Sequence, residues 1–386
     1  MMPARRQGRL SLSAASSTVL ALSLTMAAVG AGFPARIDPV ARGDRTCGWK
    51  VVSSPQVNSA ERHGTLVGVA AVSARDVWTV GNSTEHWNGS SWTVYNPVRT
   101  ESDQRLTAIA AISSKDVFVV GGDSYFSGEG RALLDRWNGV RWRKVYSPKT
   151  SPLFSPKTDL LNAVSGSSAQ DVWAAGGQPV SDGEDRAYAL HWSGHRWVGT
   201  LPAVGDIYPD ELYGIAPISS NYVLAVGNNG YAARWNGKQW TVVDSPIYAS
   251  AITALSKDDA WAVGFGSAGA VEHWNGMKWT TAPMTLPTGW SPYLESVSAA
   301  GPDDVWGVGQ MSRFNSAGQF VRERVLVAHW DGTQWTQGSS PSLRARFSEL
   351  TGVSMLPNGD AWAVGRYGKA SSYGELRPLI EHYTHC

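Results

Sequence analysis

The sequence predicts an all-β fold, a seven-bladed β-propeller with four antiparallel strands in each blade. Two recurring motifs and an unmatched pair of chain ends support this prediction. The first motif is Asp-[Val/Ala]-[Trp/Phe]-x-[Val/Ala]-Gly, which runs from "DVWTVG" at Asp76 to "DAWAVG" at Asp360, with a degenerate copy at Tyr222. The second motif is an aromatic residue followed by Asn (Ser or Asp in single copies), Gly, two variable residues and Trp. Its last copy is cut short at Tyr383.

Each repeat is expected to contain four short strands. A strand of small residues such as "LVGVAAV" leads into a turn that ends in Asp, and the Val/Trp/Val run that follows closes with Gly. A third strand ends in His-Trp or Arg-Trp, and Asn-Gly or Ser-Gly makes a tight hairpin into a fourth strand that begins with Trp. Antiparallel units that recur roughly every 40–55 residues are typical of propellers. A solenoid is the alternative, but it would need capping repeats.

The first strands and the chain ends predict how the ring closes. Small residues fill one aligned column of the first strands, as expected near a crowded axis: Gly68, Ala108, Ala163, Gly214, Ala254, Ser296 and Gly352. The last blade lacks its Trp-led strand, and "CGWKVVSSPQ" at 47–56 resembles "KQWTVVDSPI" at 238–247. We therefore expect the N-terminal segment to complete the last blade. The only two cysteines, Cys47 and Cys386, would then meet in a disulfide; two unpaired thiols are the alternative.

The N-terminus has the layout of an export signal. Three Arg residues precede an apolar, small-residue stretch, which predicts a signal peptide over 1–31, a linker over 32–46 and the propeller over 47–386. The secreted protein is expected to be extracellular and monomeric; anchoring by an uncleaved segment is the alternative. A formal net charge of +1 gives no support to nucleic-acid binding or to membrane association of the mature form.

Most of the conspicuous aromatic and histidine residues are explained by the repeat. Of the 19 Trp residues, only Trp290 lies outside the repeated columns, so the others are interpreted as contacts between blades. One column alternates between His and Arg, which indicates a scaffold position rather than a metal site: His86, Arg136, His191, Arg234, His273, His329 and His382. No local nucleophile, metal or phosphate motif occurs, so we expect no cofactor, no metal and no catalytic residues.

The repeats resemble those of kelch-type propellers of a secreted, bacterial type. The resemblance is based on strands that close in "VVGG" at 119–122 and "AAGG" at 174–177, with an aromatic residue and a second Trp downstream. It covers residues 47–386, although several copies have a single Gly. Kelch-type propellers include galactose oxidase and many interaction modules, and the sequence contains no Tyr/His copper constellation. The resemblance implies a binding scaffold, and fold alone does not decide function.

Loop lengths predict where a ligand would bind. The loops between second and third strands and the links between blades vary, and they lie on one face around the tunnel mouth. Blade six inserts "QMSRFNSAGQFVRERV" at 310–325 as such a loop, and Trp290 lies in the link between blades five and six. Acidic residues crowd these loops in blades three and four, and basic residues crowd them in blades six and seven. Aromatic and Arg side chains of this face are the predicted ligand contacts: Trp290, Tyr293, Tyr125, Phe126, Tyr188, Arg313, Phe314, Arg322, Arg346, Tyr367 and Tyr373.

Two functional hypotheses follow. The first is a secreted, non-catalytic scaffold that binds a glycan or an extracellular protein on this face, in line with the absence of catalytic motifs. The alternative is a polysaccharide-acting hydrolase or lyase whose carboxylates, drawn from different blades, are paired about 5–10 Å apart at the tunnel mouth.

Overall fold

The structure of the chain is a computed structural model that describes residues 47–54, 65–96, 104–123, 132–145, 160–179, 185–200, 211–243, 247–266, 271–369 and 376–385. The predicted signal peptide and linker lie outside these ranges. Within them, no helix is long and apolar enough to cross a bilayer. Cys386 also lies outside the described residues, so its disulfide with Cys47 stays a prediction.

Five sheets of the propeller contain four antiparallel strands each. The first contains β2 (Leu66–Ser73), β3 (Asp76–Gly81), β4 (Thr84–Trp87) and β5 (Trp92–Tyr95). The second contains β14 (Leu212–Ser219), β15 (Tyr222–Gly227), β16 (Ala232–Trp235) and β17 (Trp240–Val242). The third contains β18 (Tyr248–Ser256), β19 (Asp259–Phe265), β20 (Val271–Trp274) and β21 (Trp279–Thr281). The fourth contains β22 (Trp290–Gly301), β23 (Asp304–Phe314), β24 (Phe320–Trp330) and β25 (Trp335–Gln337). The fifth contains β26 (Phe347–Met355), β27 (Ala361–Gly368), β28 (Arg377–Thr384) and β1 (Gly48–Val51).

The remaining strands form one continuous eight-stranded sheet. They are β6 (Gln104–Ser113), β7 (Asp116–Asp123), β8 (Leu133–Trp137), β9 (Trp142–Lys144), β10 (Leu160–Ser168), β11 (Asp171–Pro179), β12 (Asp185–Trp192) and β13 (Trp197–Thr200). The expectation of seven separate blades is therefore wrong: the described residues form five four-stranded blades, and β6 to β13 are joined. The join is the pairing of Leu160 in β10 with Gly122 in β7, where a residue without a side chain lets the two backbones approach.

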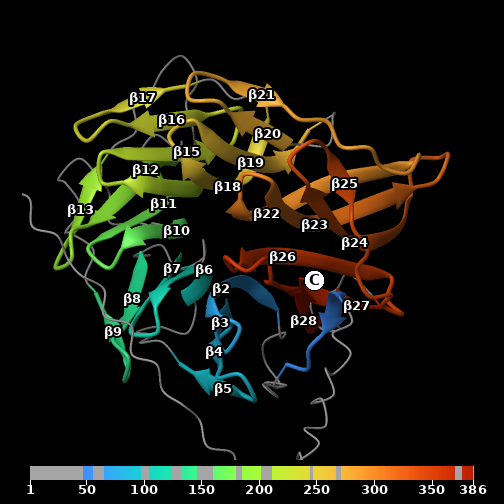
Figure 1. The fold of residues 1–386 in the computed structure, drawn as a ribbon, viewed down its shortest axis with the longest axis horizontal. Coiled ribbons are helices and arrows are strands. Elements are labelled where there is room, and N and C mark those ends of the chain that lie inside the picture. The colour runs from blue at the N-terminus through green and yellow to red at the C-terminus, as the bar shows by residue number, and fades with distance from the viewer. Residues whose placement is uncertain are drawn as a thin grey trace, which may run out of the picture. The chain divides into compact units, whose positions relative to one another are not determined.

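The first strands of the sheets surround the centre of the propeller (Figure 1). Each packs against the first strand that follows, in the order β2, β6, β10, β14, β18, β22, β26, and β26 packs against β2. The small-residue column faces these contacts: a Cβ on Gly352 would lie 3.1 Å from the Gly68 Cα. One alignment in this column was wrong. Ala251, and not Ala254, follows the bulge in β18 and pairs with Val263, as Gly68 does with Val80 in β2.

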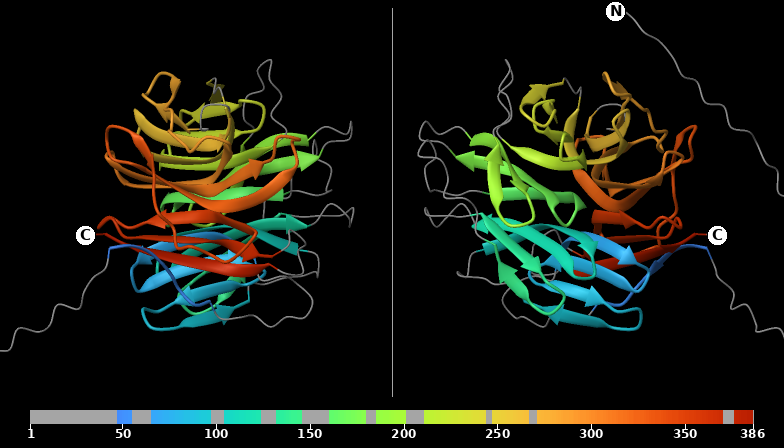
Figure 2. Two further views of the ribbon diagram at one scale, coloured as in Figure 1. Left: turned by 90° about the vertical axis from the view of Figure 1, so that its right-hand side faces the viewer. Right: turned by 60° about the vertical axis from the view of Figure 1, so that its left-hand side comes forward.

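The predicted completion of the last sheet by the N-terminal strand is confirmed. β1 pairs antiparallel with β28, and Trp49 lies opposite Tyr383. Figure 2 shows the blue strand next to the red C-terminal strand. The Trp49 ring is 5.3 Å from Trp306 and 5.4 Å from Tyr383, so an aromatic cluster fills the join between the two chain ends.

The motif Asp and the His column form one repeated local unit, as the scaffold interpretation predicts. His86 Nε2 lies 2.8 Å from Asp76 Oδ1, and its ring stacks on Trp78 with centroids 4.3 Å apart. The same Asp–His contact recurs at Asp171/His191, Asp259/His273 and Asp304/His329. Arg136 binds Asp116 in the equivalent place. The last copy differs, because Asp360 accepts a hydrogen bond from the backbone N–H of His385.

The repeated tryptophans pack neighbouring sheets together, as expected. A Trp pair spans most of the hairpins between third and fourth strands, and in most of these the second-strand aromatic of a neighbouring repeat contacts both members. Trp362 lies 6.0 Å from both Trp87 and Trp92, for example, which joins the last sheet to the first. Several indole N–H groups, including that of Trp362, have no hydrogen-bond partner among the described residues, so ring packing rather than hydrogen bonding holds these side chains.

Candidate binding surface and propeller mouth

The β22–β25 sheet carries the longest of the described strands. β22 has 12 residues and β23 and β24 have 11 each, so a hairpin extends well beyond the shared part of the sheet. Residues 310–325 were predicted to form a loop, and Trp290 was predicted to lie in a link between blades. Both predictions are wrong, because 310–314 and 320–325 extend β23 and β24 and Trp290 begins β22. A turn at 315–319, in which Asn315 Oδ1 accepts the backbone N–H groups of Ala317 and Gln319, connects the extended strands.

Three predicted contact residues lie side by side on this extension. Trp290 pairs with Arg313 across β22 and β23, and Arg313 pairs with Arg322 across β23 and β24. Residues directly opposite in an antiparallel pair point to the same face of the sheet. Arg324, two residues after Arg322, points to this face as well, and its guanidinium carbon lies 5.2 Å from the centroid of a Trp290 ring.

A second group of aromatic and basic side chains lies where the extension meets β26. The Phe320 and Phe347 rings are stacked with centroids 5.1 Å apart and an angle of 3° between their planes. The Arg346 guanidinium lies 5.9 Å from the first ring centre and 5.7 Å from the second. Phe314 packs edge-on against Phe320 and is 47% exposed. Phe314 and Arg346, two of the predicted contact residues, therefore both contact Phe320.

Positive charge is concentrated on the extension and the adjoining β26–β28 sheet. We call the following side chains the basic surface: Arg313, Arg322, Arg324, Arg344, Arg346, Lys369 and Arg377. None of them forms an ion pair with a carboxylate in the part of the chain that the structure describes. Because the whole chain has a net charge of only +1, this is a local concentration of uncompensated charge.

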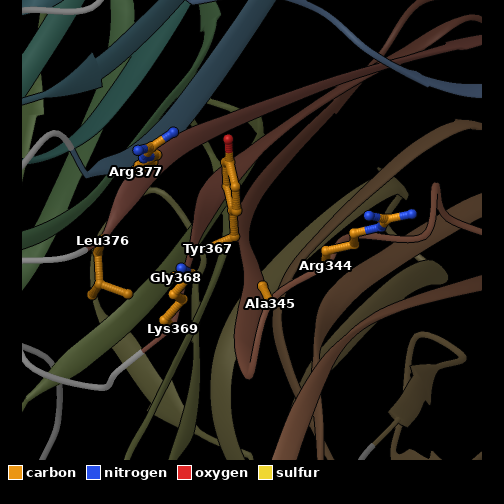
Figure 3. A pocket seen from close by; sticks show the side chains of 7 residues that line it. All are labelled: Arg344, Ala345, Tyr367, Gly368, Lys369, Leu376 and Arg377. Carbon is orange, nitrogen blue, oxygen red and sulfur yellow. The ribbon is translucent and has the colours of Figure 1, made fainter.

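Two pockets open on the basic surface. The larger, about 520 Å³, is lined by Tyr367, Arg344, Lys369 and Arg377 among others. In Figure 3 the Arg344 and Arg377 side chains lie on opposite sides of the Tyr367 ring. The smaller, about 310 Å³, lies between β24 and the link that leads to β26. The larger pocket is within the size range of small-ligand sites, and the smaller is at its lower limit.

The outer edge of β24 is already occupied along the extension. The Glu323 N–H donates to the Arg346 carbonyl, the Val325 N–H donates to Ser348 Oγ, and the Gly338 N–H donates to the Val327 carbonyl. An incoming peptide could not add a strand at these positions without breaking those bonds. Recognition on this surface therefore has to use side chains.

A cluster of carboxylates lies on the face of β23 and β24 opposite to Arg322 and Arg324, near the start of the first strands. Gln310, with its amide nitrogen toward the carboxylates, donates to Glu349 and, at 3.1 Å, to Glu323 Oε1. Arg366 donates to the other Glu349 oxygen. Burial raises the pKa of Glu323 and of Glu295 to about 7 in each case, and the neighbouring Glu349 charge acts in the same direction. Two glutamates that retain a substantial protonated fraction near neutral pH thus adjoin an ion-paired one.

Aromatic side chains continue around the mouth from this cluster. The Tyr213 and Tyr248 hydroxyls are 3.3 Å apart, and the Tyr293 hydroxyl is 3.0 Å from Ser250 Oγ. Phe265, 61% exposed, packs edge-on against Tyr293. Burial raises the pKa of Tyr213 and of Tyr293, so these phenols stay protonated as hydrogen-bonding groups.

The other predicted contact residues have different outcomes. Tyr188 is 7% exposed and packs in a core cluster with Leu190 and Trp192, so it lies away from the solvent-facing surface. Tyr367 lines the larger pocket. Tyr125, Phe126 and Tyr373 lie outside the described residues. Within the described ranges, no group of three or more His, Cys, Asp or Glu side chains could hold a metal ion.

Several residues of these regions were missed by the sequence analysis: Arg324, Arg344, Lys369, Arg377, Tyr213, Tyr248, Glu295, Glu323, Glu349 and Arg366. The basic ones had a signal, because the excess of Lys and Arg in the last two repeats was visible. The mouth residues had a weaker one. Tyr248, Tyr293 and Glu349 occupy equivalent positions in their first strands, two residues before the unpaired residue of the β-bulge. The residue type at this position differs between repeats.

The similarity to solved structures supports the β-propeller fold but no particular family or function. No model of a known protein family matches the chain, and no curated protein does either. The chain is similar to "YCF48 from Cyanidioschyzon merolae", at 14% identity and a TM-score of 0.54 over 87% of this chain and 98% of that one. It is similar to "YCF48 bound to D1 peptide", at 13% identity and 0.53 over 88% and 97%. It is also similar to the "WD40 beta propeller domain of Doa1", at 11% identity and 0.56 over 88% and 98%. The chain is a β-propeller with Trp-rich blades and WD40-like structural neighbours.

Proposed function

We propose that the chain is a non-catalytic protein-interaction scaffold that binds an acidic polypeptide segment on the basic surface. The uncompensated charge carries this proposal: seven cationic side chains on adjacent elements, such as Arg324 and Arg377, have no carboxylate partner among the described residues. An acidic partner would supply the missing charge, speed encounter and fix the orientation of binding.

The composition of the surface supports a protein ligand. Arg and aromatic side chains dominate interface hot spots, and Arg324 on Trp290 and Arg346 on the Phe320–Phe347 stack supply such groups. Planar guanidinium groups can bind carboxylates through two parallel hydrogen bonds. A propeller of similar fold, YCF48, has been solved with a bound peptide, which supports the same use of the scaffold here.

Export is part of the proposal. The charged and apolar layout of residues 1–31 supports secretion, and the partner would then be extracellular. A relationship to kelch-type propellers is likewise part of the proposal, and the paired glycines at 121–122 and 176–177 support it.

A charge-reversal experiment tests the binding surface. We would titrate a fluorescent peptide of ten glutamates, and one of ten lysines, with the disulfide-intact protein and read fluorescence anisotropy at two salt concentrations. Arg344→Glu/Arg377→Glu should weaken the acidic peptide at least about tenfold, or about 1.4 kcal/mol. Arg141→Glu, in the exposed turn of another sheet, is the matched control. Equal binding of both peptides, or of the double variant and the wild type, would refute the acidic-partner proposal. Binding of a neutral polysaccharide alone would favour a glycan ligand.

The carboxylate cluster supports a second candidate, a polysaccharide-acting hydrolase or lyase. A raised pKa on Glu295 or Glu323 suits a general acid, and Glu349, paired with Arg366, suits a base or nucleophile. Release of reducing ends from a panel of polysaccharides tests it. Activity that is lost in Glu349→Gln would favour the enzyme, and a panel without any turnover would leave the scaffold as the function.

A further inference from the structure

We infer that the smaller pocket, between β24 and the link to β26, is a binding site for a tetrahedral oxyanion, a phosphate or sulfate group. The inference deepens the proposed function, on which it rests for the partner, by naming the group that would anchor that partner. Its walls are two basic side chains of β24 and a serine-rich link, and its volume of about 310 Å³ leaves room for such a group together with part of the molecule that carries it.

The β24 wall supplies positive charge in a fixed position. Arg322 and Arg324 both line the pocket and lie two residues apart on one face of the strand. The Trp290 ring beneath Arg324 limits the positions that its guanidinium can take. Neither side chain has a carboxylate partner among the described residues, and the described lining contains no Asp or Glu. An anion would therefore meet cations that no internal charge neutralises.

The opposite wall supplies hydroxyl groups. Ser339 and Ser342 of the link line the pocket, and Ser348 closes it from β26. Ser340 lines it as well, but its hydroxyl already donates to Glu381 and is not counted as a donor to the anion. Ser348 is buried, with 6% of its surface exposed. Its Oγ already accepts the Val325 N–H, so its hydroxyl hydrogen is left to donate. The link is held to β24, because the Gly338 N–H donates to the Val327 carbonyl. The pocket is thus a built feature rather than an opening between loose segments.

The geometry favours a tetrahedral anion over a carboxylate. A carboxylate offers two coplanar oxygens, which one guanidinium can satisfy alone. Here donors come from two strands and a link, that is, from Arg322 and Arg324 on one side and Ser348 and the link on the other. Phosphate and sulfate present at least three acceptor oxygens in different directions, which matches donors on opposite walls.

Calorimetric titration of the full chain with inorganic phosphate, inorganic sulfate and acetate tests the site. We expect phosphate or sulfate to bind at least tenfold more tightly than acetate. Arg324→Gln should weaken that binding at least tenfold, and the matched Arg141→Gln in an exposed turn should change it less than twofold. Ser348→Ala, which removes one donor and keeps the Arg pair, should weaken it several-fold. The ratio of phosphate to sulfate affinity decides which ester the partner would carry.

The outcomes separate this site from the proposed function. Equal affinity for acetate, or phosphate binding that persists unchanged in Arg324→Gln, would overturn the oxyanion site even if the ten-glutamate peptide binds. Phosphate or sulfate binding that depends on Arg324 would support the site even if that peptide does not bind. A folded Arg324→Gln variant, checked by its circular dichroism and melting temperature, is required for either conclusion.

Discussion

The guanidinium carbon of Arg324 lies 5.2 Å from the centroid of a Trp290 ring, across the β22–β24 extension. Both residues lie on the face that also carries Arg313 and Arg322. Trp290 is the one tryptophan outside the repeated columns, and here it supports a basic side chain instead of filling the core. The one tryptophan outside the repeated columns therefore contacts a side chain of the basic surface.

Trp290→Ala should weaken binding of the acidic peptide without unfolding the protein. Loss of a cation–π contact of about 1 kcal/mol, together with a freer Arg324, predicts about a fivefold lower affinity in the anisotropy titration. Phe265→Ala removes an exposed aromatic at the mouth, outside the basic surface, and should leave the affinity unchanged. Equal losses in both variants would mean that the two substitutions act through general destabilisation.

The sequence predicted the parts of the fold that repeat. The motif Asp, the His column and the second-strand Trp recur because they make one local unit, as Asp76, His86 and Trp78 show. The join between β7 and β10 was not predictable, since it depends on a single backbone pairing at Gly122.

The basic surface and the mouth were predicted only in part. Trp290, Arg313 and Arg322 were predicted as loop residues, whereas the structure makes them neighbours in extended strands. Their proximity depends on strand register, which no repeated motif encodes. Tyr213 and Glu349 were missed because each repeat places a different residue type at the mouth, and a column without a common chemistry gives no pattern to follow.

Asp171→Asn should destabilise the fold at neutral pH. Burial alone would raise the pKa of Asp171, but hydrogen bonds from His191, Ser167 and Trp173 outweigh it and lower the pKa below 3.8. A carboxyl with a lowered pKa stabilises the folded state above its unfolded pKa, and this contribution is lost as the pH falls below about 3.8.

Urea denaturation at two pH values measures the Asp171 effect. We expect the variant to lose about 2 kcal/mol of unfolding free energy at pH 7, the usual cost of a buried charged hydrogen bond, and less below pH 4. Asp303→Asn, in an exposed turn, should change the free energy by less than about 0.5 kcal/mol. An equally stable Asp171→Asn protein would show that the repeated Asp–His unit contributes little to folding.

Oxidation of Cys47 and Cys386 should close the join between the chain ends. β1 and β28 pair up to Gly48 and Thr384, so the two segments that carry the cysteines are adjacent in the sequence to this pairing. Chain-entropy models assign a bridge across so long a loop about 4–5 kcal/mol, with lower values common. Mass spectrometry without reduction should find the two peptides linked, and Cys47→Ser should lower the melting temperature. A protein whose melting temperature is unchanged by reductant would contradict a clamping disulfide.

Two buried glutamates predict that the fold becomes less stable as the pH rises from about 4.5 to 7. Glu381 is fully buried and accepts a hydrogen bond from Ser340, and Glu85, 3% exposed, accepts one from Ser54. Burial raises the pKa of each to about 7, against an ordinary value of 4.5, although the serine bonds act in the opposite direction.

The direction of this pH effect follows from proton uptake. A carboxyl with a raised pKa binds its proton more tightly in the folded state. Its contribution to the free energy of unfolding is therefore fully present below pH 4.5 and is lost as the pH rises through 7. A shift of this size corresponds to at most about 3 kcal/mol for each group. The melting temperature should therefore fall between pH 5 and pH 8. Glu381→Gln keeps the shape without the charge and should flatten that fall, whereas Asp303→Asn should not. A melting temperature that rises over this range in the wild type would show that both carboxylates are solvated or paired in the folded protein.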